Sequence, residues 1–359
     1  MPKDYTYTDA GVNREQRVES KKALKNLQET YKYSHFGNVV KLPYGNIFPI
    51  GKNSFLDIVI EGVGTKVLLA QLAQKYDTIG IDAVAMAVND VIRSGAKPLA
   101  IADNIHAKES NPQLVKEWLK GISQGAAESE CPVTGGETGD VAEIISGLTQ
   151  TTAFDMVVAS VGKVEQDEII DGKNIKPGDP IIGLPSSGLH SNGITMARKI
   201  LFKQWGGKYQ PNEIPEGLNK EIALEALEPT KIYVKQLLKL TKEVKVKAAV
   251  HITGDAYTKF NNLANFSPGI GFMFDNFKPQ PIFKLIQEAA KDYCLDITDE
   301  EMFRTFNMGW GYGIIVAKED RDNALDILEK AGEKPEQIGK ITAKPEITIQ
   351  FGAKKLILA

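Results

Sequence analysis

The sequence contains few of the residues that a cysteine- or histidine-based site requires. Only two of its 359 residues are cysteine, Cys131 and Cys294, and only four are histidine. Two thiols far apart in the sequence cannot form a disulfide framework or a cysteine-rich metal site, and so low a number fits a reducing compartment. We therefore expect a cytoplasmic protein that is not a zinc enzyme.

Long apolar runs and an excess of either charge are also lacking. No run approaches the roughly 18 apolar residues of a membrane-spanning helix, and the N-terminus lacks the apolar stretch of a secretory signal. The 43 Lys and Arg residues nearly balance the 46 Asp and Glu residues, which gives a formal net charge of −3. This balance gives no electrostatic reason to expect a nucleic acid or a membrane as a partner.

The composition is otherwise that of a soluble globular protein, with 42% hydrophobic and 25% charged residues. At roughly 150 residues per domain, the length predicts two domains. The charged segment 165–179, which contains glycine and proline, marks the boundary. We therefore expect domains over 1–165 and 166–359.

Both parts of the chain alternate short apolar runs with segments of helical periodicity. Strands are expected over 55–60, 98–103, 154–161, 180–184, 270–274, 313–316 and 346–351. Helices are expected over 17–30, 67–75, 82–94, from 111 onward, and over 192–202, 230–241, 282–291 and 322–331. This alternation predicts an α/β fold built of α+β layers.

The first candidate site is the segment EGVGTK, which begins at Glu61 directly after an expected strand. Gly62 and Gly64 allow the backbone to approach a ligand closely and expose its amide groups. Glu61 suits a metal, and Thr65 with Lys66 suits the oxygens of a metal-bound polyphosphate. The spacing is not that of a Walker A motif, and an ordinary strand-to-helix turn explains the segment equally well.

Two further segments combine acidic and small residues. Asn89 and Asp90 lie late in an apolar helix, where a buried carboxylate needs a partner such as Arg93 or a metal ion. The segment GGETGD contains more glycine than a tight turn needs, and its candidate residues are Gly135, Gly136, Glu137 and Thr138. Mg²⁺ prefers oxygen ligands, so Glu61, Asp90 and Glu137 form a candidate set if the fold brings them together.

The segment PSSGLHSNG, residues 185–193, lies between an expected strand and an expected helix. Small hydroxyl residues and glycines at a helix N-terminus form an anion site, and without a lysine this one suits a phosphate monoester. Its candidate residues are Ser186, Ser187, Gly188, His190, Ser191 and Asn192. The alternative is an N-capping loop, in which His190 is only a hydrogen-bonded loop histidine.

The segment HITGD, which begins at His251, also follows an expected strand. Ligands of open α/β sheets gather near the carboxyl ends of strands, which makes Thr253 and Gly254 candidate ligand contacts. A tight turn with a solvated Asp255 is an equally good explanation.

Taken together, these segments resemble the phosphoribosylformylglycinamidine cyclo-ligase family, also called aminoimidazole ribonucleotide synthetases. The likeness runs from about residue 5 to residue 345. It is carried by segments 7–12, 61–66, 80–90, 135–138, 185–193, 228–235, 251–254 and 301–307. The resemblance implies an N-terminal α/β domain that forms a homodimer through its sheet, a C-terminal α/β domain, and a cleft between the two.

The resemblance also implies an ATP-dependent ring closure of formylglycinamidine ribonucleotide with Mg²⁺ as cofactor. Glu61, Asp90 and Glu137 would then hold the metal, and His190, His251 and Lys66 would be catalytic. ATP contacts are expected from Gly62, Gly64, Thr65, Lys66, Asn89, Asp90, Gly135, Gly136 and Thr138. Substrate contacts are expected from Ser186, Ser187, Gly188, His190, Ser191, Asn192, Thr253 and Gly254.

The chain departs from the family pattern at three places. Glu61 replaces the usual Asp, Asp255-Ala256 replaces a glycine-rich stretch, and Gly139-Asp140-Val141 follows the GGET segment. Two alternative functions follow. One is a formylglycinamidine synthetase that uses ammonia from a partner subunit, and the other is a nucleotide-binding regulatory protein without turnover.

Overall fold

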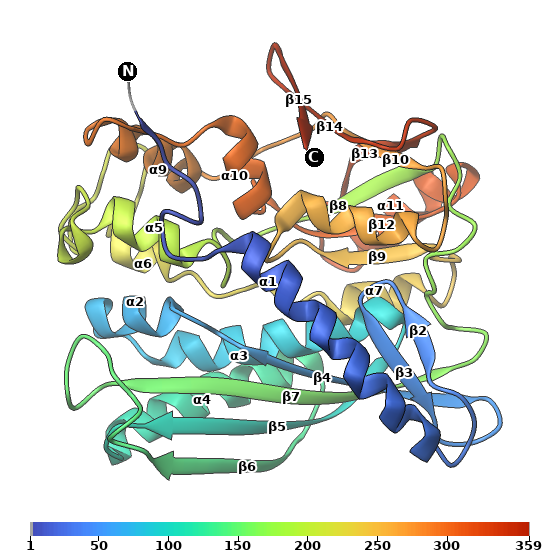
Figure 1. The fold of residues 1–359 in the computed structure, drawn as a ribbon, viewed down its shortest axis with the longest axis horizontal. Coiled ribbons are helices and arrows are strands. Elements are labelled where there is room, and N and C mark those ends of the chain that lie inside the picture. The colour runs from blue at the N-terminus through green and yellow to red at the C-terminus, as the bar shows by residue number, and fades with distance from the viewer. Residues whose placement is uncertain (1–2, 359) are drawn as a thin grey trace.

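Two mixed β-sheets organise the structure, a computed structural model that describes residues 3–358 (Figure 1). The first sheet has six strands in the order β2-β3-β4-β7-β5-β6. Their bounds are β2 Val40–Leu42, β3 Gly45–Pro49, β4 Ser54–Gly62, β5 Lys97–Ala107, β6 Val133–Asp140 and β7 Phe154–Glu165. We call this sheet and its helices the first half.

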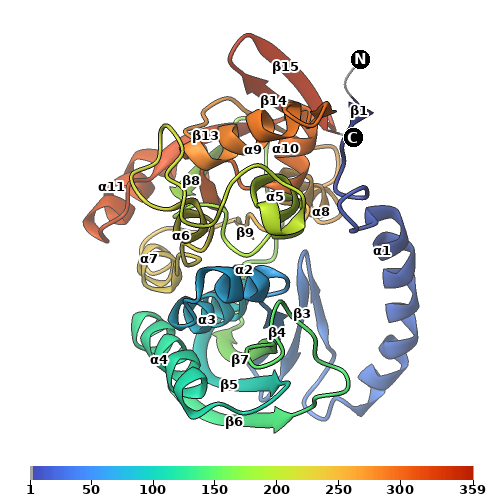
Figure 2. The ribbon, with the colours of Figure 1, turned by 90° about the vertical axis from the view of Figure 1, so that its left-hand side faces the viewer.

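Helices cover one face of the first sheet: α2 (Lys66–Ala73), α3 (Asp77–Val91) and α4 (Pro112–Ser129). The alternating burial along β7 shows which face this is, because Phe154, Met156 and Val158 are buried beneath the helices. Close approach of α3 and α4 requires glycine, since a Cβ at Gly121 would lie 2.1 Å from the carbonyl oxygen of Asp77. Figure 2 shows α3 between the first sheet and the rest of the molecule.

The second half is built on a seven-stranded sheet in the order β15-β14-β10-β13-β8-β12-β9. The strands are β8 Pro180–Pro185, β9 Ala248–His251, β10 Gly271–Phe274, β12 Trp310–Ile315, β13 Glu336–Thr342, β14 Ile347–Phe351 and β15 Lys354–Leu358. Its helices are α5 Ile194–Leu201, α6 Ile222–Ala226, α7 Val234–Leu240, α8 Asn261–Ala264, α9 Pro281–Lys291, α10 Asp299–Thr305 and α11 Arg321–Lys330. Its short 3-10 turns are η3 Lys203–Trp205, η4 Ala256–Phe260 and η5 Lys318–Asp320, whereas η2 (Ile92–Ser94) follows α3 in the first half.

The start of the chain packs on the second half rather than on the first. Strand β1 (Lys3–Asp4) pairs in parallel with β11 (Leu295–Asp296). The chain then forms α1 (Arg14–Lys21) and η1 (Lys22–Tyr33), neither of which contains a buried residue. Figures 1 and 2 show this helical segment running along the outside of the molecule from the second half to β2 of the first.

The expected α/β fold is confirmed, but some elements differ from the sequence prediction. The segment expected to be a glycine-rich ligand loop is the edge strand β6, and its residues are exposed apart from a partly buried Gly139. The hairpin of β2 and β3 and the strand β13 were not expected. None of the helices within residues 3–358 combines the length and apolar character needed to cross a membrane.

Candidate active site

A cavity of about 820 Å³ lies where the two halves and α1 meet. The first half contributes the end of β4, the C-terminal part of α3 and η2, and the second half contributes the loop after β9 and η4. The charged residues that line it are Arg14, Arg17, Lys21, Glu61, Asp90, Arg93, Asp255, Lys259 and Arg304. We call this cavity the cleft.

Glu61 and Asp90 are brought together at the floor of the cleft. Glu61 is the last residue of β4 on the side that faces the helices, and Asp90 lies on the last turn of α3. Burial and the neighbouring Asp90 carboxylate raise the pKa of Glu61 to about 7. The pair therefore resists carrying two negative charges unless a cation joins it.

Asp90 is held by two side chains from different halves. Arg93 Nη2 lies 2.7 Å from Asp90 Oδ2, and His251 Nδ1 lies 2.7 Å from Asp90 Oδ1. Burial alone would raise the pKa of Asp90, but Arg93 and the His251 hydrogen bond outweigh it and hold that pKa well below its usual range. Burial lowers the pKa of His251 to about 4, so at neutral pH a neutral His251 donates from Nδ1 to an ionised Asp90.

Lys259 is a functional candidate that the sequence analysis did not identify. Its ammonium group donates to the carbonyl oxygen of His251 at 3.1 Å and to Thr253 Oγ1 at 2.5 Å. Burial lowers the pKa of Lys259 to about 8, although nearby Asp90 and Glu61 oppose the shift. Its position in η4 follows no motif, and only the fold places it beside the expected loop that contains Thr253 and Gly254.

Lys66 lies elsewhere, in a fully buried interface between α3 and the second half. Its Nζ donates to Asp82 Oδ1 at 2.8 Å and to the carbonyl oxygen of Glu228 at 2.7 Å, and both ion-pair side chains are 0% exposed. Thr230 donates to the same Asp82 oxygen through its backbone N–H (2.7 Å) and its hydroxyl (2.6 Å). Lys66 is therefore engaged by the protein itself and is not among the residues that line the cleft.

Asn89 belongs to the same interface, although its sequence neighbour Asp90 faces the cleft. Its side-chain amide donates to the carbonyl oxygen of Lys231 at 2.8 Å, and its Oδ1 accepts the backbone N–H of Tyr233 at 2.9 Å. We call Lys66, Asp82, Asn89 and Thr230 the seam.

Of the expected phosphate loop in residues 185–193, only Asn192 lines the cleft. Ser187 Oγ donates to the carbonyl oxygen of Pro229, and Ser191 Oγ donates to Asp82 Oδ1. Ser186 Oγ donates to Asn307 Oδ1, and Gly188 accepts from Asn307 Nδ2. This loop therefore packs mainly against protein groups.

His190 is buried at 1% exposure and adopts a left-handed backbone conformation with φ of 60°. Its Nε2 accepts the backbone N–H of Ser187 at 3.2 Å. Burial holds the pKa of His190 well below its usual value, so the ring is neutral.

The glycine loop after β4 connects the cleft to the seam. Gly62 ends β4, Gly64 takes a positive φ of 59°, and Thr65 precedes α2. Thr65 Oγ1 lies 2.9 Å from Thr195 Oγ1 of α5, a direct contact between the halves. Gly62 and Gly64 are exposed and directly follow Glu61 in the chain.

Within a single chain, the structure does not bring Glu137 together with Glu61 and Asp90. Across the sheet, Glu137 is paired through Asn104 with Val157 of β7, whereas Glu61 is paired with the next residue of β7, Val158. Because successive residues of a strand point to opposite faces, the two carboxylates point to opposite faces of the sheet. Three strand spacings, ~14 Å, separate β6 from β4. Within residues 3–358, no three His, Cys, Asp or Glu side chains are grouped to hold a metal ion.

Gly135, Gly136 and Thr138 share the exposed edge strand with Glu137. A Cβ at Gly136 would lie 2.2 Å from Asp103 Oδ1, so a larger residue there would displace the Asp103 side chain. These residues do not belong to the cleft lining.

The chain matches two models of known protein domains. Residues 45–164 match the model described as AIR synthase related protein, N-terminal domain, and residues 176–352 match its C-terminal domain. Together the matches cover most of the chain, including the glycine loop, α3 and the loop after β9.

Curated relatives are similar over nearly their whole length. The phosphoribosylformylglycinamidine cyclo-ligase of Pyrococcus horikoshii is 39% identical, with 95% of this chain and 96% of the relative covered. That of Bacillus cereus strain AH187 is 36% identical, with 96% and 98% covered.

Solved structures show the same fold at low identity. The HypE–HypF complex matches with a TM-score of 0.62 at 16% identity and covers 95% of this chain and 99% of that chain. PurL of T. maritima complexed with ATP matches with a TM-score of 0.57 at 14% identity and covers 95% of this chain and 52% of that chain.

Proposed function

Because the chain belongs to the phosphoribosylformylglycinamidine cyclo-ligase family, we propose that its cleft is where ATP drives the ring closure of formylglycinamidine ribonucleotide. The chain is an ATP-dependent ligase of purine biosynthesis, as its curated relatives are named and as their nearly complete coverage supports. The observation that carries the proposal is the juxtaposition of Glu61, Asp90, Arg93 and Lys259 in one cavity between the halves.

The chemistry requires an activated formamide. Its oxygen is a poor leaving group, so transfer of the γ-phosphoryl group of ATP to that oxygen gives an imidoyl phosphate and ADP. The amidine nitrogen then attacks the same carbon, loses a proton, and expels phosphate as the five-membered ring closes. Both reacting groups belong to one molecule, so the protein mainly orients them, an effect worth several kcal/mol.

Glu61 and Asp90 fit a magnesium site. Mg²⁺ is commonly held by one or two carboxylates together with substrate phosphates, so the absence of Glu137 from this cluster does not remove the fit. Burial and the Asp90 carboxylate raise the pKa of Glu61 although Lys259 and Arg93 oppose the shift, so a further cation beside the pair is favoured. Mg²⁺ bound there would neutralise phosphate oxygens.

Lys259 and Arg93 are the cations closest to this pair and are proposed to bind the phosphate oxygens. Phosphoryl transfer depends mainly on positioning and charge stabilisation. Lys259 is tethered by two acceptors, and Arg93 is tethered by Asp90, so both cations are held in place before a ligand arrives.

His251 is the better placed of the two expected proton shuttles. Its Nδ1 contacts Asp90 at the cleft, whereas Nε2 is buried without a hydrogen-bond partner in the described chain. His190 also has a buried ring nitrogen without a partner in the described chain, Nδ1, but its Nε2 accepts from the backbone of its own loop and not from a cleft residue. We propose that Asp90 orients His251 and that His190 supports the loop.

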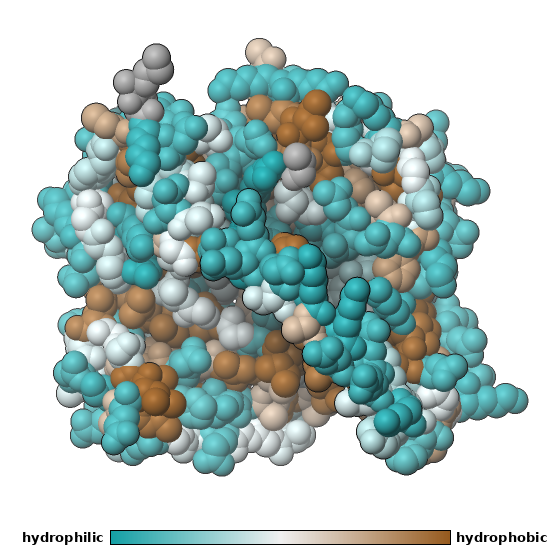
Figure 3. Space-filling view, viewed as in Figure 1, coloured by the Kyte–Doolittle hydropathy of each residue, from teal (hydrophilic) through white to brown (hydrophobic). Residues whose placement is uncertain are grey.

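A homodimer through the first sheet is also proposed. The face of β4 opposite the helices exposes Ile58 (51%) and Ile60 (66%), and large apolar side chains exposed on a sheet face favour association. Figure 3 shows hydrophobic surface on the lower half of the molecule, beside the hydrophilic band of α1 and η1. We expect Ile60→Lys to convert a dimer into a monomer in sedimentation analysis, and an unchanged mass would contradict this interface.

The proposed reaction is tested with purified protein, formylglycinamidine ribonucleotide, ATP and Mg²⁺, by following aminoimidazole ribonucleotide and ADP together. We expect one ADP per ring closed, and little product from Glu61→Gln. ATP binding without product would favour a regulatory protein. Turnover only of the earlier formylglycinamide ribonucleotide with ammonia would favour a synthetase.

A further inference from the structure

The α1 helix carries a row of cations to which the proposed reaction assigns no role. Arg14, Arg17 and Lys21 are spaced three and four residues apart, so they share one face of the helix. All three line the cleft, together with Val18 of the same face. Helix α1 therefore forms a cationic outer wall of the cleft, opposite the residues that the two halves contribute.

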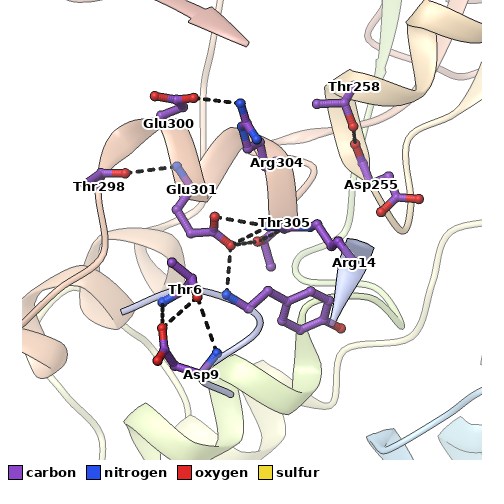
Figure 4. Close-up of polar contacts among 11 residues, drawn as sticks. Thr6, Asp9, Arg14, Asp255, Thr258, Thr298, Glu300, Glu301, Arg304 and Thr305 are labelled. Carbon is purple, nitrogen blue, oxygen red and sulfur yellow. Dashed lines mark hydrogen bonds and ion pairs between the residues drawn. The ribbon is translucent and has the colours of Figure 1, made fainter. Parts of the chain in front are cut away.

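A network at the start of α1 fixes this wall in place (Figure 4). Arg14 Nη1 donates to Glu301 Oε1 at 2.8 Å, and Arg14 Nη2 donates to Thr305 Oγ1 at 2.6 Å. Glu301 also accepts the backbone N–H of Tyr7 at 3.0 Å and is only 8% exposed. Arg14 is thus occupied in anchoring α1 to α10, which leaves Arg17 and Lys21 over the cleft.

The facing wall has donors without acceptors. Arg304 of α10 donates through Nη2 to Glu300 at 2.8 Å, but its Nε is buried and has no hydrogen-bond partner within residues 3–358. The same holds for Nδ2 of Asn192. Both residues line the cleft, and buried donors in native structures almost always have an acceptor, from protein, water or a ligand.

The charges of the cleft divide into two groups. Glu61 and Asp90 accompany Arg93 and Lys259 on the floor, and this group suits a metal-bound nucleotide. The cations of α1 and α10 have only Asp255 as a further carboxylate in the lining. This second group therefore has an excess of positive charge without a metal-binding pair.

We propose that Arg17, Lys21, Arg304 and Asn192 form a binding site for a phosphate monoester, separate from the nucleotide site of the same cleft. Arginine and lysine together with an amide donor match the several acceptor oxygens of a phosphate dianion. The inference rests on the proposed function, in which the monoester is the 5′-phosphate of the ribonucleotide. The polyphosphate of ATP is the other source of this chemistry, and the test separates the two.

The test measures the affinity of ribose 5-phosphate and, separately, of MgATP by titration calorimetry. Arg17→Gln and Arg304→Gln should each weaken ribose 5-phosphate about tenfold, the size of one lost charge-assisted contact. Both variants should leave MgATP affinity within about twofold. Lys25→Gln is the matched control, because Lys25 is an exposed cation of η1 outside the described lining of the cleft, and it should change neither affinity.

Several outcomes would overturn the proposal. Weaker MgATP with unchanged ribose 5-phosphate would assign these cations to the nucleotide. An equal loss in Lys25→Gln would mean general electrostatic attraction, and unchanged affinities in both arginine variants would mean no site. Arg17 is exposed on α1, so its variant remains informative if Arg304→Gln does not fold. Ribose 5-phosphate binding that depends on these residues without ring closure would contradict the reaction but not this site.

Discussion

The seam and the cleft use neighbouring residues of the same motifs for different purposes. Lys66 is five residues after Glu61, yet it is buried in the seam while Glu61 faces the cleft. Asn89 and Asp90 are adjacent on α3 and are divided in the same way. A motif that resembles a ligand site therefore also contains the residues that fix one half of the molecule against the other.

The two regions differ in how fully their polar groups are satisfied. In the seam, Lys66 and Asn89 bond to backbone groups of the second half, and Lys66 also pairs with Asp82 of α3. In the cleft, Glu61 retains a raised pKa and Asn192 retains an unpaired donor within residues 3–358. The seam is not fully paired either, because Asp82 Oδ2 is buried without a hydrogen-bond partner within residues 3–358. The difference is that both seam cation and amide side chains bond to protein groups, whereas the cleft keeps polar groups that face a cavity.

The largest expected effect is on the seam. Lys66→Met leaves the Asp82 carboxylate buried without its cation, which should destabilise the protein by about 3–5 kcal/mol. Denaturant unfolding measures this change. Lys75→Met is the control, because Lys75 pairs with Asp77 at 44% and 25% exposure and should cost less than about 1 kcal/mol.

A Lys66→Met protein of unchanged stability would contradict the structural role of the seam. If such a protein bound ATP poorly but the ribonucleotide normally, Lys66 would be a phosphate ligand, as the sequence led us to expect. The structure predicts instead that Lys66→Met lowers the free energy of unfolding, and that any selective loss of ATP affinity is secondary to this.

A smaller effect is expected in the cleft, and on activity rather than stability. Glu61→Gln should lower kcat at least about 10²-fold, because removal of one of the two carboxylates proposed to bind the metal weakens charge stabilisation by several kcal/mol. Its unfolding free energy should not fall and should rise at neutral pH, since burial and Asp90 disfavour the ionised carboxylate of the parent. Glu61→Asp keeps the carboxylate and should retain activity. Equal loss in both variants would mean that length, not charge, is decisive.

The smallest expected effect concerns Asp57, which shares the helix-facing side of β4 with Glu61 and is 8% exposed. Burial raises its pKa to about 6, against about 3.9 in the unfolded chain. The folded state therefore binds the proton more tightly, so stability present below pH 4 is lost as pH rises through 6.

Asp57→Asn should remove this dependence. Relative to the parent, the variant should gain about 2 kcal/mol of unfolding free energy between pH 4 and pH 7. Denaturant unfolding at several pH values measures the difference. A constant difference across this range would show that the Asp57 carboxyl group titrates normally.

Much of the fold follows from local sequence patterns. The alternating run that forms β7 and the capped start of α4 at Asn111 are strong signals. Strand β6 could not be predicted, because its glycine-rich sequence has low strand propensity and is held by pairing with β5 over residues 101–107. Likewise, β1 depends on a partner nearly 300 residues away.

The sequence predicts only part of the candidate site, because some of its residues belong to recognisable motifs and others are placed there by tertiary packing alone. Glu61, Asp90, Asn192, Thr253 and Gly254 were identified as ligand candidates, and the fold places all of them in the cleft lining. Lys259 and Arg17 have no distinguishing local sequence, since only tertiary packing brings them to the cavity. Lys66 is buried in the seam, whereas Glu61 lines the cleft. Local sequence does not reveal this difference, because burial depends on the whole fold.

Diffraction from a crystal grown with Mn²⁺ and a non-hydrolysable ATP analogue tests the central claim most directly. We predict an anomalous peak in the cleft, about 2.1 Å from carboxylate oxygens of Glu61 or Asp90, with the Lys66–Asp82 pair intact. A peak coordinated by Glu137 without these two residues, or analogue phosphates bound to Lys66, would contradict it.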